Sequence, residues 1–119
     1  MKKYGGGFSR SERVGQQLHE VLAKLLLVEV EDPRLSRVQI TDVDLSHDLR
    51  HAKVYYVMLD GEEPDKNVLQ AIDSVSGFLR SRLGAELQLQ YVPELDIRFD
   101  EAVLKGRRID ELLDGLKEE

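Results

Sequence analysis

The sequence predicts an α+β domain in which helices pack on one face of a three-stranded sheet. Three observations predict this class. Apolar residues recur at helical spacing near the N-terminus, they recur again in the middle of the chain, and segments rich in β-formers follow each of these stretches. Helices and strands in this order form one sheet covered by helices. The length of 119 residues fits a single domain.

The first helix is predicted to begin after Ser9, because Ser9 and Glu12 have the spacing of a capping box. It should end near residues 29–31, since Asp32 precedes Pro33 and the residue before a proline avoids helical geometry. The aliphatic residues between these limits fall on one helical face. They are Val14, Leu18, Val21, Leu22 and Leu25.

Two strands are predicted next, joined by a turn at residues 46–48. Residues 38–41 alternate in polarity, and Val43 and Leu45 continue the alternation in the opposite phase. A phase slip of one residue within a strand indicates a β-bulge. Residues 52–59 are rich in β-formers and are expected to pair back on the first strand as a hairpin.

A helix with a break in its middle is predicted between Pro64 and Gly84. Proline suits the first turn of a helix, and glycine suits its C-terminal cap. Residues 74–77, Ser-Val-Ser-Gly, interrupt the helical pattern between them. Glycine costs about 1 kcal/mol in a helix interior, and serine can bond to the backbone instead. We therefore expect a kink that divides two helical segments.

A long third strand and a short terminal helix complete the predicted order. The apolar residues from Leu87 to Phe99 all have odd numbers and should share one face, while Pro93 indicates an edge position or a bulge. Residues 102–116 have helical spacing. We expect a single domain at 9–116, a flexible basic arm at 1–8 around a Gly triplet, and an acidic tail at 117–119.

The composition narrows the class of protein. The chain has no cysteine, which excludes disulfides and thiolate catalysis. No stretch is long and apolar enough for a membrane span, and no apolar region follows the N-terminal lysines as in a signal peptide. A cytoplasmic protein is therefore expected. The net charge of −6 is uneven, since the first 13 residues are basic and the C-terminal end is acidic.

The sequence offers little for catalysis. His47, Asp48 and His51 lie close together, but a zinc site needs three or four ligands of defined geometry, and we predict no metal site. Asp42 and Asp44 share a strand face, which leaves open a small hydrolase that uses them with a histidine. There is no phosphate-binding loop, dinucleotide-binding turn or nucleophile elbow. We predict a protein that is not an enzyme and needs no cofactor.

The predicted order of elements, α-β-β-α-α-β, is that of a type II KH domain. KH domains bind single-stranded nucleic acid with a Gly-x-x-Gly loop between two helices. This chain has no Gly-x-x-Gly, and Val75-Ser76-Gly77 stands in its place, followed by Arg80 and Arg82. Basic residues beside a helix break favour an approach of the nucleic-acid backbone.

Several short segments, in order along nearly the whole chain, resemble the bacterial ribosome-binding factor A family. They are Ser-Glu-Arg-Val at 11–14, Asp-Pro-Arg-Leu at 32–35, Ala-Lys-Val-Tyr at 52–55, Gly-Phe-Leu-Arg-Ser-Arg-Leu-Gly at 77–84, Val-Pro-Glu-Leu at 92–95, Phe-Asp at 99–100 and Gly-Arg-Arg-Ile at 106–109. Family members usually have Ala-x-Gly at the kink, where this chain has Val75, and an arginine at the position of Gln90.

The resemblance implies a type II KH fold with a kinked Ala-x-Gly element. It also implies a cytoplasmic, monomeric assembly factor, with a role in cold adaptation, that binds the small (30S) ribosomal subunit during maturation of its 16S rRNA. Ribosomal proteins are expected as further contacts. The alternative is a KH-like protein-interaction module without direct RNA contact, which the negative net charge favours.

The predicted RNA-binding residues are mainly cations that would contact phosphates. Those of the arm and first helix are Lys2, Lys3, Arg10 and Arg13. Those around the kink are Ser76, Gly77, Arg80 and Arg82, where the glycine would admit the RNA backbone closely. The remaining three are Arg37, Arg50 and Lys53.

Overall fold

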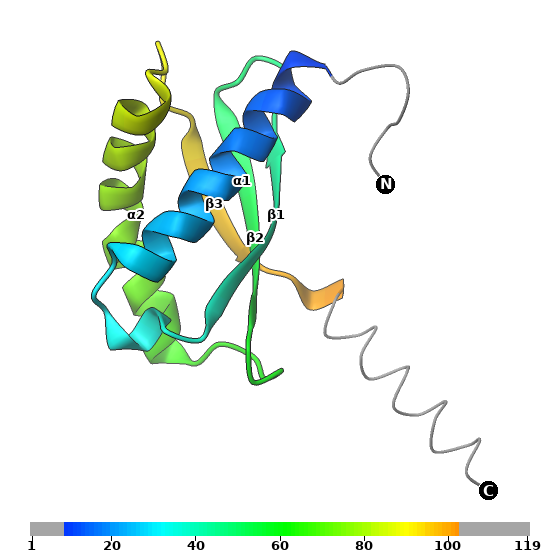
Figure 1. The fold of residues 1–119 in the computed structure, drawn as a ribbon. Coiled ribbons are helices and arrows are strands. Elements are labelled where there is room, and N and C mark those ends of the chain that lie inside the picture. The colour runs from blue at the N-terminus through cyan, green and yellow to red at the C-terminus, as the bar shows by residue number, and fades with distance from the viewer. Residues whose placement is uncertain (1–8, 103–119) are drawn as a thin grey trace, which may run out of the picture.

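The computed structural model describes residues 9–102 and contains two long helices and three strands (Figure 1). Their order confirms the α+β class. The elements are α1 (Arg10–Val28), the short 3₁₀ helix η1 (Pro33–Leu35), β1 (Val38–Leu45), β2 (His51–Met58), α2 (Lys66–Leu87) and β3 (Glu94–Phe99).

The strands form one sheet in the order β1-β2-β3. β1 and β2 pair antiparallel, and β2 and β3 pair parallel. The register between β1 and β2 shifts between Ile40 and Asp42, so that Thr41 has no opposite residue. This irregularity confirms the bulge that the change of phase predicts, and it keeps Val43 and Leu45 on the buried face.

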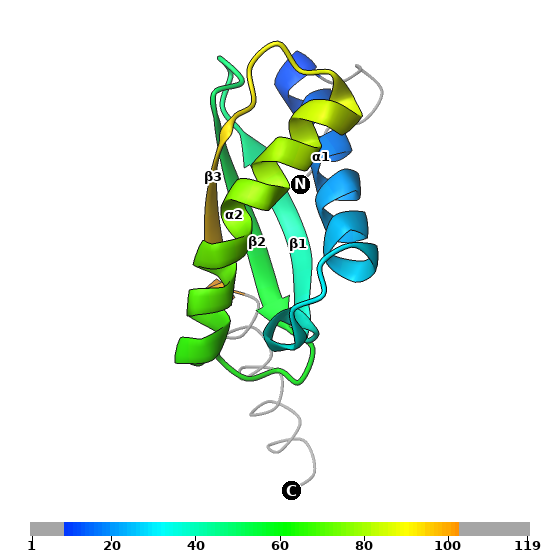
Figure 2. The ribbon, with the colours of Figure 1, turned by 90° about the vertical axis from the view of Figure 1, so that its left-hand side faces the viewer.

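Both helices lie on the same face of the sheet, as the two views show (Figures 1 and 2). The core between the two layers is almost entirely aliphatic, with Tyr56 as its largest buried side chain. α1 contributes Leu18, Leu22 and Leu25 to this core, as its periodicity predicts. The face of the sheet away from the helices carries most of the polar side chains of the strands.

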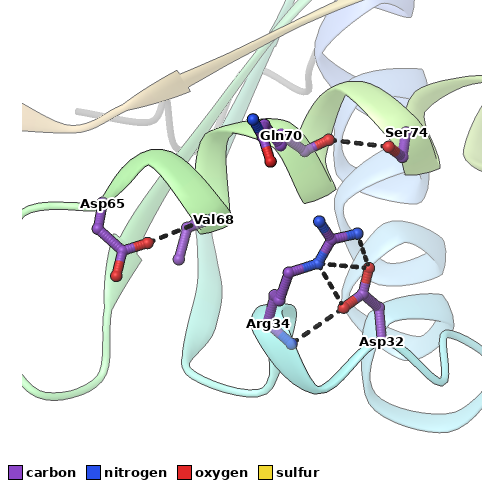
Figure 3. Close-up of polar contacts among 6 residues, drawn as sticks. All are labelled: Asp32, Arg34, Asp65, Val68, Gln70 and Ser74. Carbon is purple, nitrogen blue, oxygen red and sulfur yellow. Dashed lines mark hydrogen bonds and ion pairs between the residues drawn. The ribbon is translucent and has the colours of Figure 1, made fainter.

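The ends of α1 follow from local signals. The N–H of Glu12 donates to Ser9 Oγ at 3.2 Å, and the N–H of Ser9 donates to Glu12 Oε1 at 3.3 Å, so the capping box is formed. After the helix ends, Asp32 caps η1 by accepting from the N–H of Arg34 at 3.0 Å (Figure 3). Pro33 opens that short helix.

α2 is a single helix, so the predicted division into two helical segments is wrong. Its N-cap is Asp65, whose Oδ1 accepts from the N–H of Val68 at 3.0 Å (Figure 3). Ser74 does bond to the backbone, donating to the carbonyl of Gln70 at 2.9 Å, but the residues after it stay helical. Such bonds bend helices, and Figure 2 shows the axis of α2 changing direction along its length. Burial of apolar residues on both sides of the bend offsets the cost of Gly77.

The helix also continues past Gly84, which is not its C-terminal cap as predicted. The cap is Gln88, a non-glycine residue with a φ of 50° in the left-handed region. Gly84 has a different purpose, since a Cβ there would lie 2.8 Å from Cγ2 of Val92. Glycine lets the chain after the helix pack against α2 at this point.

The third strand is shorter than predicted. Leu87 belongs to α2, and β3 starts only at Glu94, directly after the buried Pro93, which has no N–H for the ladder. Within β3 the prediction is confirmed, because the odd-numbered residues face the helices and the even-numbered ones are exposed. β3 is also an edge strand, as the proline indicates.

Three predicted segments lie outside the described residues: the basic arm at 1–8, most of the terminal helix at 102–116 and the acidic tail at 117–119. Between residues 9 and 102, no helix is long and apolar enough to cross a membrane.

Candidate nucleic-acid interface

Three connecting parts of the chain meet at one end of the molecule. The start of α1, the turn between β1 and β2 and the loop between α2 and β3 all lie at this end (Figures 1 and 2). We call the surface that they carry the loop end and define it by Arg10, Arg13, Arg50 and Tyr91. It gathers three of the predicted cations, two from the start of α1 and one from the turn between β1 and β2.

The turn between β1 and β2 is built around Asp48. Its Oδ1 accepts from Ser46 Oγ at 2.6 Å and from the N–H of Arg50 at 3.1 Å. The hydrogen bond from Ser46 and the one from the Arg50 backbone lower the pKa of Asp48 below its usual value. Leu49 has a φ of 63°, which turns the chain tightly between these partners. The turn therefore holds the backbone of Arg50 in a defined position.

Arg50 and Tyr91 join this turn to the loop before β3. The guanidinium carbon of Arg50 lies 5.3 Å from the centre of the Tyr91 ring, within the range of a cation–π interaction. The N–H of Glu94 donates to the carbonyl of Arg50 at 2.8 Å and ties the two backbones together. Tyr91 lies before β3 and is 63% exposed, so its predicted place on the shared apolar face of the third strand is wrong. Pro93 is the signal that could have separated it from the strand.

Arg80 holds the same loop from α2. Its Nε donates to the carbonyl of Pro93 and its Nη2 to the carbonyl of Val92, each at 3.1 Å. Arg80 is predicted to contact a phosphate, but two of its N–H donors are used for hydrogen bonds within the protein. Arg80 supports the loop end rather than lying in it.

Arg82 makes different contacts from Arg80. Its Nη2 forms ion pairs with Glu29 at 2.9 Å and with Glu86 at 3.3 Å, which link α2 to the end of α1. Its Nε is buried and has no hydrogen-bond partner among residues 9–102. The two arginines beside the predicted kink therefore serve separate internal contacts.

Ser76 and Gly77 lie in the interior of α2. Ser76 is half-buried and Gly77 is exposed. A Cβ built on Gly77 meets no atom within 4 Å, so the surface above this residue is open. An RNA backbone has steric access to the helix here.

Arg37 and Lys53 lie apart from the loop end. Arg37 precedes β1 and forms an ion pair with Asp60, at the opposite end of the molecule. Lys53 is exposed in the middle strand, opposite Asp44 in β1 and Asp96 in β3. The structure thus brings together only part of the predicted set, and Lys2 and Lys3 lie outside the described residues.

The residues of the hydrolase alternative converge only in part, because Asp44 and His47 line one small hollow to which Asp42 does not contribute. Asp42 Oδ1 accepts from the N–H of Val43 at 2.9 Å, while Asp44 is exposed beside Lys53 across the sheet. His19 is half-buried in α1, and its Nε2 lies 3.3 Å from the carbonyl oxygen of Ile40. Among the described residues, no three histidine, aspartate or glutamate side chains gather as a metal site would require.

Comparison with known proteins identifies the family. The family model described as ribosome-binding factor A matches residues 10–113. A ribosome-binding factor A from Geobacter metallireducens is 40% identical over 106 residues, which cover 89% of this chain and 90% of the relative. One from Pseudomonas putida is 43% identical over 109 residues, covering 90% of this chain and 83% of the relative.

Solved structures agree with this assignment. The crystal structure of ribosome-binding factor A from Thermus thermophilus superposes with a TM-score of 0.65 at 25% identity, over 75% of this chain and 93% of the other. A solution NMR structure from Thermotoga maritima gives a TM-score of 0.66 at 27% identity, over 79% and 91%. Coordinates for the Thermus protein fitted into a map of a 30S–RbfA complex give 0.63 at 26% identity, over 75% and 93%. The shared fold is KH-like, and this chain belongs to the ribosome-binding factor A family.

Proposed function

We propose that this protein is an assembly factor that binds the small (30S) ribosomal subunit and assists the late maturation and processing of its 16S rRNA. Membership of the ribosome-binding factor A family is the observation that carries the proposal. The structure of a relative fitted into a 30S complex supports the choice of partner.

The loop end is the proposed main contact with RNA. Arg10 and Arg13 belong to the first turn of α1, and Arg50 belongs to the turn between β1 and β2 at the same end of the molecule. Arginine matches the geometry of phosphate oxygens with its planar set of donors. Lys2 and Lys3 precede this end in sequence and are proposed as further phosphate contacts.

The charge of the whole chain supports a single orientation on RNA. The net charge of −6 means that the chain as a whole repels a polyanion. The loop end combines its three arginines with nearby carboxylates, so the arginines meet phosphates only in an orientation that keeps Glu12 and Asp48 away from the RNA backbone. We therefore propose that the charge distribution determines both the site on the RNA and the orientation in which the protein binds.

A second contact is proposed over α2 at Ser76 and Gly77. The open surface above Gly77 admits a phosphodiester backbone without a side chain in the way. Arg80 and Arg82 lie in the following turns, and reorientation of either toward RNA would exchange an internal contact for a phosphate contact. The protein acts by binding in this proposal, as a monomer without a cofactor.

The test is sedimentation of the protein with mature and immature small subunits over a series of salt concentrations. We expect the affinity to fall steeply with salt, because each phosphate contact releases counterions and contributes about 0.7–0.9 to the slope. Arg10→Gln with Arg13→Gln should weaken binding and lower that slope.

Arg34→Gln with Arg37→Gln provides the matched control, since it also removes two arginine charges, at the opposite end of the molecule. Equal effects of this control and the loop-end variant would reject the loop end as the main contact. Wild-type protein that binds neither kind of subunit would reject the proposed function.

One observation favours the alternative of a protein-interaction module. A groove of about 790 Å³ runs between the second half of α1 and the start of β1, bordered by Leu27 and Leu59, which are 85% and 62% exposed. Its rim carries Glu31 and Asp32, so a basic ribosomal protein is the complementary partner. Binding to subunits that is lost in Leu27→Ser but unchanged in Arg10→Gln with Arg13→Gln would support this candidate.

A further inference from the structure

We infer that Tyr91 and Arg50 form a platform on which one unpaired RNA base stacks. The inference rests on the proposed function, since it names the feature of the RNA that the loop end recognises. It differs from a phosphate contact because it depends on the ring of Tyr91 and not on charge alone.

The ring of Tyr91 is exposed although it belongs to a supported arrangement. Single exposed aromatic residues are common and carry little information by themselves. Here, however, a guanidinium lies 5.3 Å from the ring centre, while 63% of the residue stays accessible to solvent. A ring backed by a cation and open to solvent can accept a further flat group.

The loop that carries Tyr91 is fixed directly after this residue. The carbonyls of the two following residues, Val92 and Pro93, accept hydrogen bonds from Arg80. Pro93 is fully buried, and the side chain of Val92 packs so closely on α2 that a Cβ at position 84 would lie 2.8 Å from it. The backbone next to Tyr91 is therefore held in place before any ligand binds, which lowers the entropic cost of stacking.

Arg50 is held by its backbone and not by its side chain. Its N–H donates to Asp48 and its carbonyl accepts from Glu94. Among residues 9–102 its guanidinium forms no ion pair and lies over the ring of Tyr91 at 5.3 Å. Its N–H donors are thus available to the phosphate of a nucleotide whose base lies on the ring.

The chemistry of the platform selects unpaired nucleotides. A single exposed ring can stack only on a base whose face is free, and bases within a duplex are covered by their neighbours. Loops, bulges and ends of RNA expose such faces, and proteins read them with aromatic rings and arginine planes. The ligand we assign to the platform is therefore an unpaired nucleotide of the small-subunit rRNA.

The test compares Tyr91→Leu with Tyr91→Phe in the full chain. Both keep an apolar side chain at an exposed position, but only phenylalanine keeps the ring. We expect Tyr91→Phe to bind small subunits like the wild type and Tyr91→Leu to bind about 5- to 100-fold more weakly, since stacking is worth about 1–3 kcal/mol per base. The salt slope should not change in Tyr91→Leu, whereas Arg50→Gln should lower it by about 0.7–0.9.

Ultraviolet cross-linking identifies the partner of the ring. The peptide that contains Tyr91 should carry a cross-linked nucleotide from a single-stranded region of the rRNA. Equal affinity of Tyr91→Leu and wild type, or a cross-link to a ribosomal protein or to no RNA, overturns the inference. Failure of the wild type to bind subunits would instead overturn the proposed function, so the two failures are distinct.

Discussion

At the scale of single residues, the two glycines of α2 differ in their surroundings and therefore in their roles. Gly77 lies on the open surface of the helix, where an added Cβ meets nothing. Gly84 faces the loop before β3, where a Cβ would lie 2.8 Å from Val92. Neither has the left-handed backbone that would require glycine by itself.

Gly77→Ala and Gly84→Ala should therefore differ in stability. Alanine at 77 should raise the free energy of unfolding by up to about 1 kcal/mol, the difference in helix propensity. Alanine at 84 gains the same propensity but crowds a stiff, β-branched side chain, so Gly84→Ala should be less stable than Gly77→Ala by about 1–3 kcal/mol. Urea denaturation of the two variants measures this difference.

The same pair tests the proposed role of Gly77 in binding. If RNA approaches the helix there, Gly77→Ala should bind small subunits more weakly although it is the more stable protein. Unchanged binding would remove position 77 from the interface. If Gly84→Ala were as stable as Gly77→Ala, the side chain of Val92 would be able to move away from the new Cβ without loss of stability.

At the scale of elements, the connection from α2 to β3 decides the shape of the loop end. The helix ends at Gln88, and within six residues the chain must turn back to pair parallel with β2. Arg80 crosses from the helix to bond two consecutive carbonyls of this connection. These bonds join elements that are separate in sequence.

Arg80→Met should loosen this connection. Methionine keeps the apolar stem but loses both hydrogen bonds, and we expect the free energy of unfolding to fall by about 1–2 kcal/mol. Amide hydrogen exchange should increase most in residues 88–93, because the loss is local.

Arg98→Met is the matched control, since Arg98 forms an exposed ion pair with Asp96 inside β3. Such pairs contribute at most about 1 kcal/mol. A cost for Arg98→Met as large as that for Arg80→Met would argue that Arg80 does not fasten the loop.

At the scale of the whole molecule, the hydrogen-bonded carboxyl groups determine how the stability of the fold depends on pH. Several exposed carboxyl groups have pKa values lowered in the folded state by hydrogen bonds: from the Arg34 side chain to Asp32, from Ser46 to Asp48, from the Glu62 backbone to Asp60 and from the Arg98 side chain to Asp96. Each of these carboxylates accepts its hydrogen bond from a residue in its own turn or strand.

The stability of the protein should therefore fall in acid. A carboxyl group with a lowered folded pKa stabilises the folded state above its unfolded pKa, near 3.8, and this contribution is lost as the pH falls through the folded value. The urea midpoint should hold between about pH 7 and 5 and decrease below about pH 4. A midpoint that rises in this acid range would contradict the assigned pKa directions.

The candidate site was predictable only in part. The sequence predicts Arg10, Arg13 and Arg50, and the structure shows that two separate segments, the start of α1 and the turn between β1 and β2, bring them to one end. Tyr91 was missed because its odd number matched the alternation of β3, although Pro93 separates it from that strand. The ion pair of Arg37 could not be anticipated, because Asp60 reaches it only through the pairing of β1 with β2.

The sequence by itself determined the class of the fold, the capped first helix, the hairpin and the bulge in β1. These depend on signals spread over a few residues, such as a capping box or a change of phase. The tertiary structure alone decided the continuity of α2, the end of that helix at Gln88 and the partners of Arg80 and Arg82. Burial against the sheet outweighs a local helix breaker, and long side chains find partners as remote in sequence as Glu29 is from Arg82.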